Sequence, residues 1–235
     1  MSGARSSQMI KRYIQSQIGK KQLVAISGLA LVLFVMFHLS ANLLLFLGPD
    51  YFNFFPELMH STGIGLRFIE AGLASVFFAH IGLTVALVRQ NRKARDHQYQ
   101  TVDTSNRSIA TRLMPYTGTL LLLFLAFHIN DFVLQDHFGS KSMVAGESLG
   151  LYGLVYNAFA NPFRVGLYVL GVFSLGFHLS HGIQSVVQTL GYHHPQYTPI
   201  IKHLSRGLGV LVAVLFASIP FYFSYINAIG CCYVS

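Results

Sequence analysis

Five long apolar runs are the feature of this chain that most restricts its fold. A helix of about 18 or more apolar residues can cross the roughly 30 Å hydrocarbon core of a bilayer. Only 10% of the residues are charged, whereas soluble domains carry about 25%. We therefore predict an all-α integral membrane bundle, formed by residues 1–235 as a single domain. Its five transmembrane helices should cover approximately residues 22–47, 66–88, 113–135, 163–188 and 207–229.

The charged residues predict how this bundle is oriented. Basic residues gather beside one end of the apolar runs, at Arg5, Lys11, Arg12, Lys20, Lys21, Arg89, Arg92, Lys93, Arg95, Arg107, Arg112, Lys202 and Arg206. The opposite connections, about 48–65 and 136–162, hold Asp50, Glu57, Asp136 and Glu147, with Lys141 as their one base. Short basic loops stay on the cytoplasmic side. We therefore expect a multi-pass protein of the inner (cytoplasmic) cell membrane, with the N-terminus inside and the C-terminus outside.

The same distribution restricts the partners of the chain. A formal net charge of +8 could indicate nucleic-acid binding, but the basic residues lie at helix ends beside apolar spans. Such positions favour the lipid bilayer and an acidic protein surface on the cytoplasmic side over nucleic acid. The first 20 or so residues are polar and amphipathic, which argues against a cleavable signal peptide. We expect a short interfacial helix at Ile10–Ile18 that leads into the first span.

The cysteines exclude several kinds of metal site. Cys231 and Cys232 are adjacent, and two cysteines are too few for an iron–sulfur cluster or a structural zinc site. No Cys-x-x-Cys-His motif occurs, which excludes a covalently attached c-type haem. The sequence offers no physical role for this cysteine pair.

Histidines within the spans are the candidate functional residues. Six of the eleven histidines lie in polar segments, where surface positions are expected: His60, His97, His137, His193, His194 and His203. The other five lie in the first four spans: His38, His80, His128, His178 and His181. A histidine in a membrane helix is costly and marks a functional site, although one alone could serve helix–helix hydrogen bonding. Histidines in four consecutive spans predict two b-type haems, each ligated by two histidines from facing helices.

Depth along the helices sorts four of these histidines into two pairs. At about 1.5 Å per residue, His38 and His128 lie roughly 24–25 Å from the inner ends of their spans. His80 and His178 lie roughly 14–15 Å from the inner ends of theirs. We therefore expect an outer haem on His38 and His128 and an inner haem on His80 and His178. The two levels are about 10 Å apart, which suits electron transfer between the haems.

His181 offers an alternative ligand for the inner haem. It lies three residues after His178, so both side chains project from neighbouring positions on one helix face. We favour His178 because its depth matches that of His80 better. The other histidine would then contact a haem propionate or a water near the inner surface.

Four segments resemble a known family. They are QLVAISGLALVLFVMFHLSANLLLF, FFAHIGLTVAL, LLFLAFHINDF and VFSLGFHLSHGIQSVVQTLG, and they resemble the cytochrome b558 membrane anchor of succinate dehydrogenase/fumarate reductase. The resemblance is to its single-subunit, five-helix, di-haem type and extends from about Lys20 to about Asn227. It implies haem ligands at His38, His80, His128 and His178. Some relatives carry another residue at the position of His181, which leaves that choice open.

The resemblance also implies partners and a role. Such anchors bind a flavoprotein and an iron–sulfur protein on the cytoplasmic face and pass electrons between the iron–sulfur clusters and a quinone, usually menaquinone. Dicarboxylate chemistry takes place in the flavoprotein and not in the anchor. The working direction, succinate oxidation or fumarate reduction, stays open, as do the quinone type and the oligomeric state.

Quinone chemistry also needs an ionisable group for proton transfer. Glu70 is the first candidate, near the start of the second span, although a structural pair with Arg67 three residues away would explain it equally well. Asp131, one turn beyond His128, is the second candidate for the same outer site. An inner site near Ser27 and Lys21 is a weaker alternative.

Two other functions compete with this interpretation. A di-haem anchor of a hydrogenase or a formate dehydrogenase would use the same paired histidines with another partner. A proton-coupled transporter could instead use membrane histidines as relays, and would then be colourless and often built from an internal repeat. We find no convincing repeat along the chain, and the fifth span has no histidine.

Overall fold

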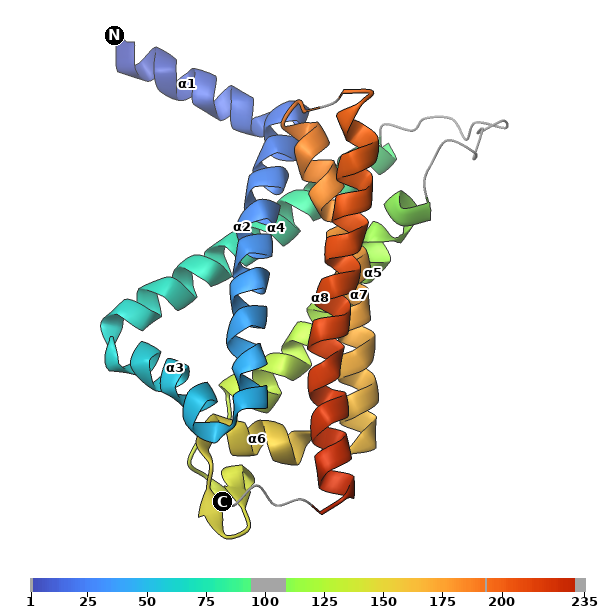
Figure 1. Ribbon diagram of the computed structural model, residues 1–235. Helices are drawn as coiled ribbons and strands as arrows, with labels where there is room; N and C mark the ends of the chain where they lie inside the picture. Colours follow the sequence, from blue (N-terminus) through green and yellow to red (C-terminus); the bar gives the residue numbers. More distant parts are fainter. Residues whose placement is uncertain (1, 94–108, 193, 231–235) are drawn as a thin grey trace.

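The computed structural model describes residues 2–93, 109–192 and 194–230. Several residues considered above lie outside this part: Arg95, His97, Arg107, His193, Cys231 and Cys232. The fold is an all-α membrane bundle, as predicted (Figure 1). The described residues contain five helical segments long and apolar enough to cross a membrane: Gln17–Leu47, Ile64–Lys93, Arg112–Val133, Pro162–Thr189 and Tyr197–Ala228. The prediction of five spans is therefore confirmed, and the fifth helix begins well before the predicted residue 207.

The spans are built from five α-helices and two short extensions. They are α2 (Gln17–Leu43) with the 3₁₀ helix η1 (Leu44–Leu47), α4 (Ile64–Lys93), α5 (Ile109–His128) with the π-helical turn η3 (Ile129–Val133), α7 (Pro162–Thr189) and α8 (Tyr197–Ala228). We call the end of the bundle that holds the start of α2 the inner end, after its predicted cytoplasmic side, and the opposite end the outer end. The end of α8 lies at the outer end (Figure 1), as an odd number of crossings requires.

A bend at Ser16 separates the first helix from the bundle. Helix α1 (Ser2–Gln15) stops there because Ser16 adopts an extended conformation, and its hydroxyl accepts a hydrogen bond from the amide of Gly19 at 3.0 Å. A side chain at Gly19 would collide with the carbonyl of Tyr13, so the bend needs glycine there. As a result α1 projects away from the bundle (Figure 1). The predicted helix Ile10–Ile18 is thus wrong in its bounds, and its position in the membrane interface stays a prediction.

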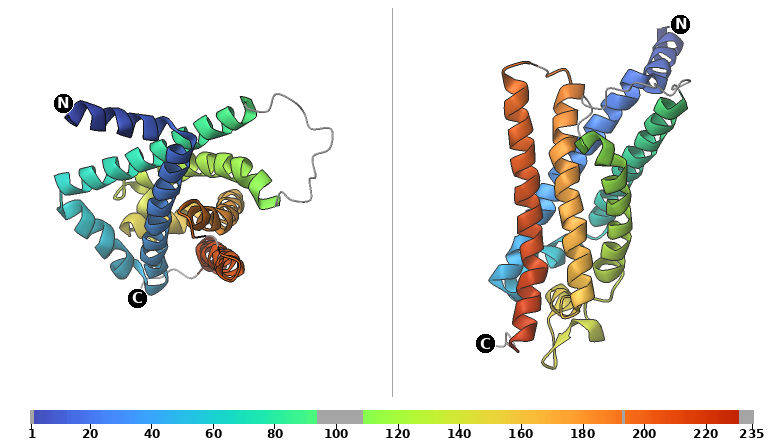
Figure 2. Two further views of the ribbon diagram at one scale, coloured as in Figure 1. Left: turned by 90° about the horizontal axis from the view of Figure 1, so that it is seen from above. Right: turned by 90° about the vertical axis from the view of Figure 1, so that its right-hand side faces the viewer.

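Helices α7 and α8 form the most closely packed pair, and they lie side by side in both views of Figure 2. Gly176 and Gly209 face each other where the two helices meet. A Cβ atom added to Gly176 would lie 2.6 Å from the carbonyl oxygen of Gly209. Small residues permit this close approach of two backbones in a bilayer, where packing contacts replace the hydrophobic effect. Leu179 and Val212 are buried beside this contact, together with Leu39 of α2.

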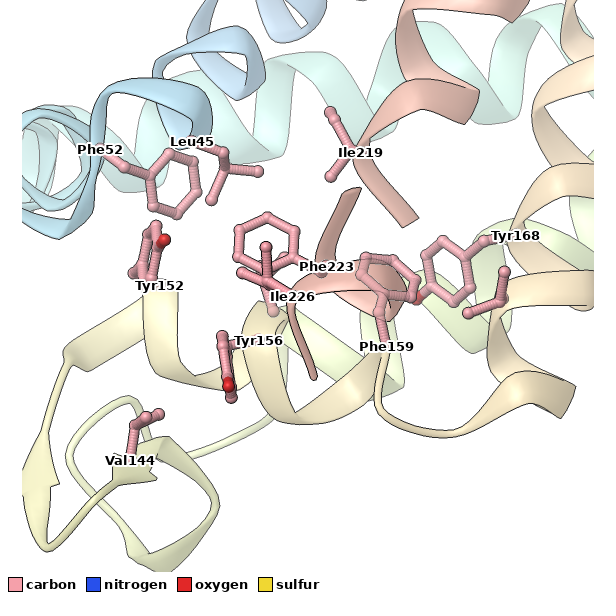
Figure 3. Packing of buried hydrophobic residues seen from close by; sticks show 12 residues of the cluster. Leu45, Phe52, Val144, Tyr152, Tyr156, Phe159, Tyr168, Ile219, Phe223 and Ile226 are labelled. Atoms are coloured by element: carbon pink, nitrogen blue, oxygen red, sulfur yellow. The ribbon is translucent and has the colours of Figure 1, made fainter. Parts of the chain in front are cut away.

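The outer end carries structure that the sequence analysis treated as loops. It contains α3 (Pro49–Ser61), the 3₁₀ helix η4 (Ser140–Ser142), the hairpin of β1 (Met143–Val144) and β2 (Glu147–Ser148), and α6 (Gly150–Ala158). Figure 3 shows the cluster that these elements form with the end of α8, in which Tyr152 and Phe223 are 1% and 0% exposed. Asn53 joins α3 to α6 by donating to the carbonyl of Leu149 and accepting from the amide of Tyr152. We call this region the outer cap.

Helix α4 packs mainly against a single neighbour. It crosses α2 obliquely and reaches the rest of the bundle mainly through that contact (Figure 1). Among its described residues, Leu87 near the inner end is buried. The second span therefore meets the other helices at the level of His80, while its outer half extends toward α3.

Candidate functional site

The outer histidine pair joins α2 and α5. The ring centres of His38 and His128 are 5.7 Å apart, and the ring planes are nearly perpendicular at 88°. Imidazole nitrogens bind metal ions at about 2 Å, which places two rings on opposite sides of one ion about 6 Å apart, centre to centre. The spacing of His38 and His128 is close to this value, so the pair fits a single iron between the two rings.

Aromatic rings surround this outer pair. Phe34, one turn before His38, stacks on it at 5.5 Å, and Phe124, one turn before His128, lies 5.9 Å from it. The buried Nδ1 atom of His128 has no hydrogen-bond partner among the described residues. Buried polar atoms are nearly always satisfied. This exception therefore indicates a ring placed for a group that the protein chain itself does not supply.

The inner histidines are held by hydroxyl groups from other helices. The Nδ1 atom of His80 on α4 lies 3.1 Å from the hydroxyl of Ser27 on α2. The Nδ1 atom of His178 on α7 lies 3.2 Å from the hydroxyl of Thr117 on α5. Each hydroxyl residue is followed by a glycine, and that glycine is the neighbour of the same histidine ring. The four helices that carry histidines are therefore connected in pairs at the inner level.

His178 and His181 differ in their surroundings. His178 contacts Thr117 and lies near both His80 and His181. His181 is half-buried one turn nearer the inner end of α7. The hydroxyl contact of His178 has a counterpart at His80, which favours His178 as the partner of His80. The assignment of any of these residues as haem ligands stays a prediction.

The two carboxylate candidates lie in different environments. Only 8% of the Asp131 side chain is exposed, and it pairs with Arg164 at 3.3 Å and accepts a hydrogen bond from the Tyr168 hydroxyl at 3.2 Å. The Tyr168 ring lies 6.1 Å from that of His128, which connects Asp131 to the outer pair. The Glu70 side chain is 46% exposed and pairs with Arg67 at 2.9 Å. This is the structural pairing considered above as the alternative to a catalytic role.

The two weaker inner candidates, Lys21 and Ser27, lie in different surroundings. Lys21 is exposed in the first turn of α2. The hydroxyl of Ser27 is already engaged, because it contacts His80 and donates to the carbonyl of Leu23 at 2.8 Å. The structure thus places Ser27 against a histidine ring, a role that sequence reasoning missed. It missed Thr117 altogether, although both residues immediately precede a glycine within a span.

The remaining described histidines lie outside the paired sets. His60, His194 and His203 are exposed and His137 is half-buried, in keeping with the surface positions expected for them. No group of three or more His, Cys, Asp or Glu side chains that could hold a metal ion occurs among residues 2–93, 109–192 and 194–230. A bis-histidine haem needs no such group, because the macrocycle supplies the remaining ligands.

The fold and the paired histidines define a class of protein, a polytopic membrane bundle whose histidines meet from facing helices. The chain is similar to the succinate dehydrogenase cytochrome b558 subunit of Bacillus subtilis (strain 168). The two are 23% identical over 184 residues, which cover 77% of this chain and 82% of that protein. No protein-family model and no solved structure matches the chain. The similarity supports a cytochrome b membrane subunit of a succinate dehydrogenase, and with it membership of an oxidoreductase complex.

Proposed function

We propose that this chain is the di-haem membrane anchor of a succinate:quinone oxidoreductase, carrying electrons between an iron–sulfur partner and a quinone. The observation that carries the proposal is the contact between the two outer histidine rings, together with the proximity of two further histidines at a second level. His38 lies beside His128 at the outer level, and His80 and His178 lie near each other at the inner level. Four half-buried histidines in a bilayer are costly unless they have a function. Two haems would give each pair of histidines a function as ligands.

The protein contributes position and environment to this chemistry. His80 and His178 would hold the inner haem, and His38 and His128 the outer one, with His181 as a propionate contact or an alternative inner ligand. Haem b, when bound, supplies one-electron chemistry at its iron. Phe34 and Phe124 lie against the outer rings and give them an apolar surrounding.

The inner end of the bundle suits a protein partner with an acidic surface. Exposed basic residues lie there at Lys21, Arg89, Arg92, Lys93 and Arg206. We propose that an iron–sulfur subunit and its flavoprotein dock on this side, which places the inner histidines nearest to the incoming electrons. Anionic lipid headgroups could share the same charges.

Asp131 is the better supported group for quinone protonation. A mostly buried carboxylate is expensive in a membrane protein unless it has a partner or a function. Asp131 has two partners, and one of them, Arg164, is 43% exposed at the outer end of α7. This chain of contacts joins the outer surface to the ring next to His128. We therefore propose that menaquinone or another quinone reacts beside the outer pair, with Glu70 and the Ser27–Lys21 region as less supported sites.

The reduced-minus-oxidised absorption spectrum of the purified protein, with its haem-to-polypeptide ratio, tests the proposal. We expect low-spin b-type bands and about two haems per chain. A ratio near one would restrict the proposal to a single pair. Protein that binds no haem would contradict the proposal and favour the histidine-relay transporter. Co-purification with an iron–sulfur protein that oxidises succinate would separate this anchor from that of a hydrogenase or a formate dehydrogenase.

A further inference from the structure

The residues that contact the inner histidines belong to a repeated sequence pattern. Residues 27–38 read SGLALVLFVMFH and residues 117–128 read TGTLLLLFLAFH. Both follow the pattern [Ser/Thr]-Gly-x-x-Leu-x-Leu-Phe-x-x-Phe-His. The pattern covers twelve residues in each of two spans, and the two copies lie on α2 and α5, which run in the same direction across the bundle (Figure 1).

The spacing within the repeat places a hydroxyl and a histidine on the same helix face. Each hydroxyl residue precedes its histidine by eleven residues, and eleven residues make about three helical turns. The hydroxyl and the histidine therefore project from the same side of the helix, roughly 16 Å apart along its axis. The outer pair consists of the two equivalent histidines, His38 and His128. The inner pair, His80 and His178, is contacted by the two equivalent hydroxyls.

The direction of these hydrogen bonds depends on the number of protons available. A hydroxyl has one proton to donate and two lone pairs to accept with. Ser27 directs its proton to the carbonyls of its own helix, Leu23 at 2.8 Å and Val24 at 3.1 Å. Its oxygen is then an acceptor for the Nδ1 atom of His80. This arrangement favours the Nδ1–H tautomer of His80, in which the Nε2 atom carries the free lone pair.

The same reasoning holds at the second copy. The Thr117 hydroxyl lies 3.2 Å from the carbonyl of Leu113 and 3.1 Å from that of Met114, so it too donates within its own helix. This favours donation from the Nδ1 atom of His178 to Thr117. In the Nδ1–H tautomer both inner histidines would present Nε2 lone pairs, which is the form that binds iron.

The glycines beside the hydroxyls give each ring its place. A Cβ atom at Gly28 would lie 3.2 Å from Cε1 of His80, and one at Gly118 would lie 3.5 Å from Cε1 of His178. Each ring therefore lies against the backbone of the facing helix, with its Nδ1 atom at the hydroxyl.

We propose that Ser27–Gly28 and Thr117–Gly118 are equivalent positioning pairs that hold His80 and His178 as Nδ1–H tautomers for the inner haem. The proposal rests on the proposed role of these two histidines as ligands. A hydrogen bond donated by Nδ1 raises the basicity of the ligating nitrogen. It therefore stabilises the oxidised iron, and the two hydroxyls together lower the midpoint potential of the inner haem.

Redox titration of the purified complex, with electron paramagnetic resonance of each ferric haem, tests this proposal. We expect Ser27→Ala and Thr117→Val each to shift the midpoint potential of one and the same haem upward, and the double variant to shift it further. Ser27→Thr and Thr117→Ser keep the hydroxyl and should restore the wild-type potential. Thr84→Val is the matched control, because the Thr84 hydroxyl donates to the backbone carbonyl of His80 and not to its ring.

Ser27 and Thr117 lie on different helices, so the proposal requires that both single variants shift the midpoint potential of the same haem. Unchanged potentials in both, or shifts in two different haems, would overturn the proposal. An equal shift in Thr84→Val would also overturn it, because the effect would then come from general packing.

A haem-free measurement separates this proposal from the proposed function. Nitrogen-15 NMR of histidine-labelled protein without haem reports which ring nitrogen carries the proton. We expect His80 and His178 as Nδ1–H tautomers, lost at His80 in Ser27→Ala and at His178 in Thr117→Val. Nε2–H tautomers in the wild type would refute the positioning role. Failure of the wild-type chain to bind haem would refute the proposed function, while the NMR experiment would still decide whether Ser27 and Thr117 set the two tautomers.

Discussion

The outer and inner histidine pairs are built by different means, although the same two helices serve both. At the inner level each ring nitrogen meets a hydroxyl, and each ring lies against a glycine of the facing helix. At the outer level the rings lie among phenylalanines, and the Nδ1 atom of His128 has no partner among the described residues. The inner pair is thus fixed by polar contacts within the protein. The outer pair is packed mainly by aromatic side chains, with one polar contact between the Asn42 amide and Nε2 of His38 at 3.3 Å.

Removing one histidine of a pair is the strongest way to test this difference. We expect His128→Ala or His38→Ala to lower the haem-to-polypeptide ratio from about two to about one. The remaining haem should keep its wild-type spectrum, because the inner rings are held by Ser27 and Thr117. The ratio and the spectrum of purified variants measure the effect. Loss of both haems from an outer variant would show that the two pairs do not form independently.

Asp131→Asn should give the next largest effect, on quinone turnover. Asparagine can still accept from Tyr168 but cannot carry a proton, so we expect turnover to fall about a hundredfold with both haem spectra intact. Glu70→Gln is the comparison variant, since its exposed pair with Arg67 contributes about 0–1 kcal/mol. The measurement is quinone-dependent turnover at saturating succinate. A larger loss in Glu70→Gln would move the proton-transfer role to that residue.

Gly171→Ala should disturb the outer pair selectively. Gly171 lies on α7, and an added Cβ atom would lie 2.5 Å from Cγ of Phe124, the ring beside His128. Overpacking of this kind costs about 1–3 kcal/mol. We expect a lower melting temperature and a changed resonance of the outer haem. Gly166→Ala on the same helix is the control, because its added methyl group has no neighbour within 4 Å.

The two glycines of the inner level should respond unequally. A methyl group at Gly28 would press on His80 at 3.2 Å, so we expect Gly28→Ala to shift the inner-haem resonance slightly. At Gly118 the distance of 3.5 Å is an ordinary van der Waals contact, so Gly118→Ala should behave as wild type. Electron paramagnetic resonance of the two variants checks this order. Equal effects in the two variants would contradict the distances given above between the added methyl groups and the histidine rings.

The smallest effect is expected at His181. His181→Asn should keep about two haems per chain, because the Thr117 contact favours His178 as the inner ligand. The haem content of this variant decides between the two histidines. A loss of one haem would make His181 the inner ligand and His178 a supporting residue.

The sequence predicts the spans and two histidine levels. It does not predict the contacts between helices. Hydropathy predicted the five spans because the bilayer demands long apolar helices. It missed α3 and α6, because segments of that length bury their apolar side chains only through tertiary contacts, those of α3 with α6 and η1 and those of α6 with α8, such as Tyr152 against Phe223. The two histidine levels could be obtained from helix rise alone. The hydroxyl contacts could not, since Ser27 and His80 are brought together only by the crossing of α2 and α4.

The repeat offered a signal that was available but weak. Its copies match at Gly28 and Gly118 and at the histidines, yet leucine, valine and phenylalanine are common in any membrane helix. Only the equivalent contacts of Ser27 and Thr117 show which matches matter. The ion pair of Asp131 and Arg164 was also beyond sequence reasoning, because the two residues come from different helices.

The backbone just beyond the two repeated histidines breaks the likeness of the two copies. After His38 the helix tightens into η1, and after His128 it widens into the π-helical turn η3. Widening inserts an extra residue into the turn and rotates the next residues of the chain, so Asp131 meets Tyr168 and Arg164. Ala41 holds the corresponding place in the first copy. Only the second copy is therefore followed by an acidic side chain, and the proposed exchange of protons would be confined to that side of the bundle.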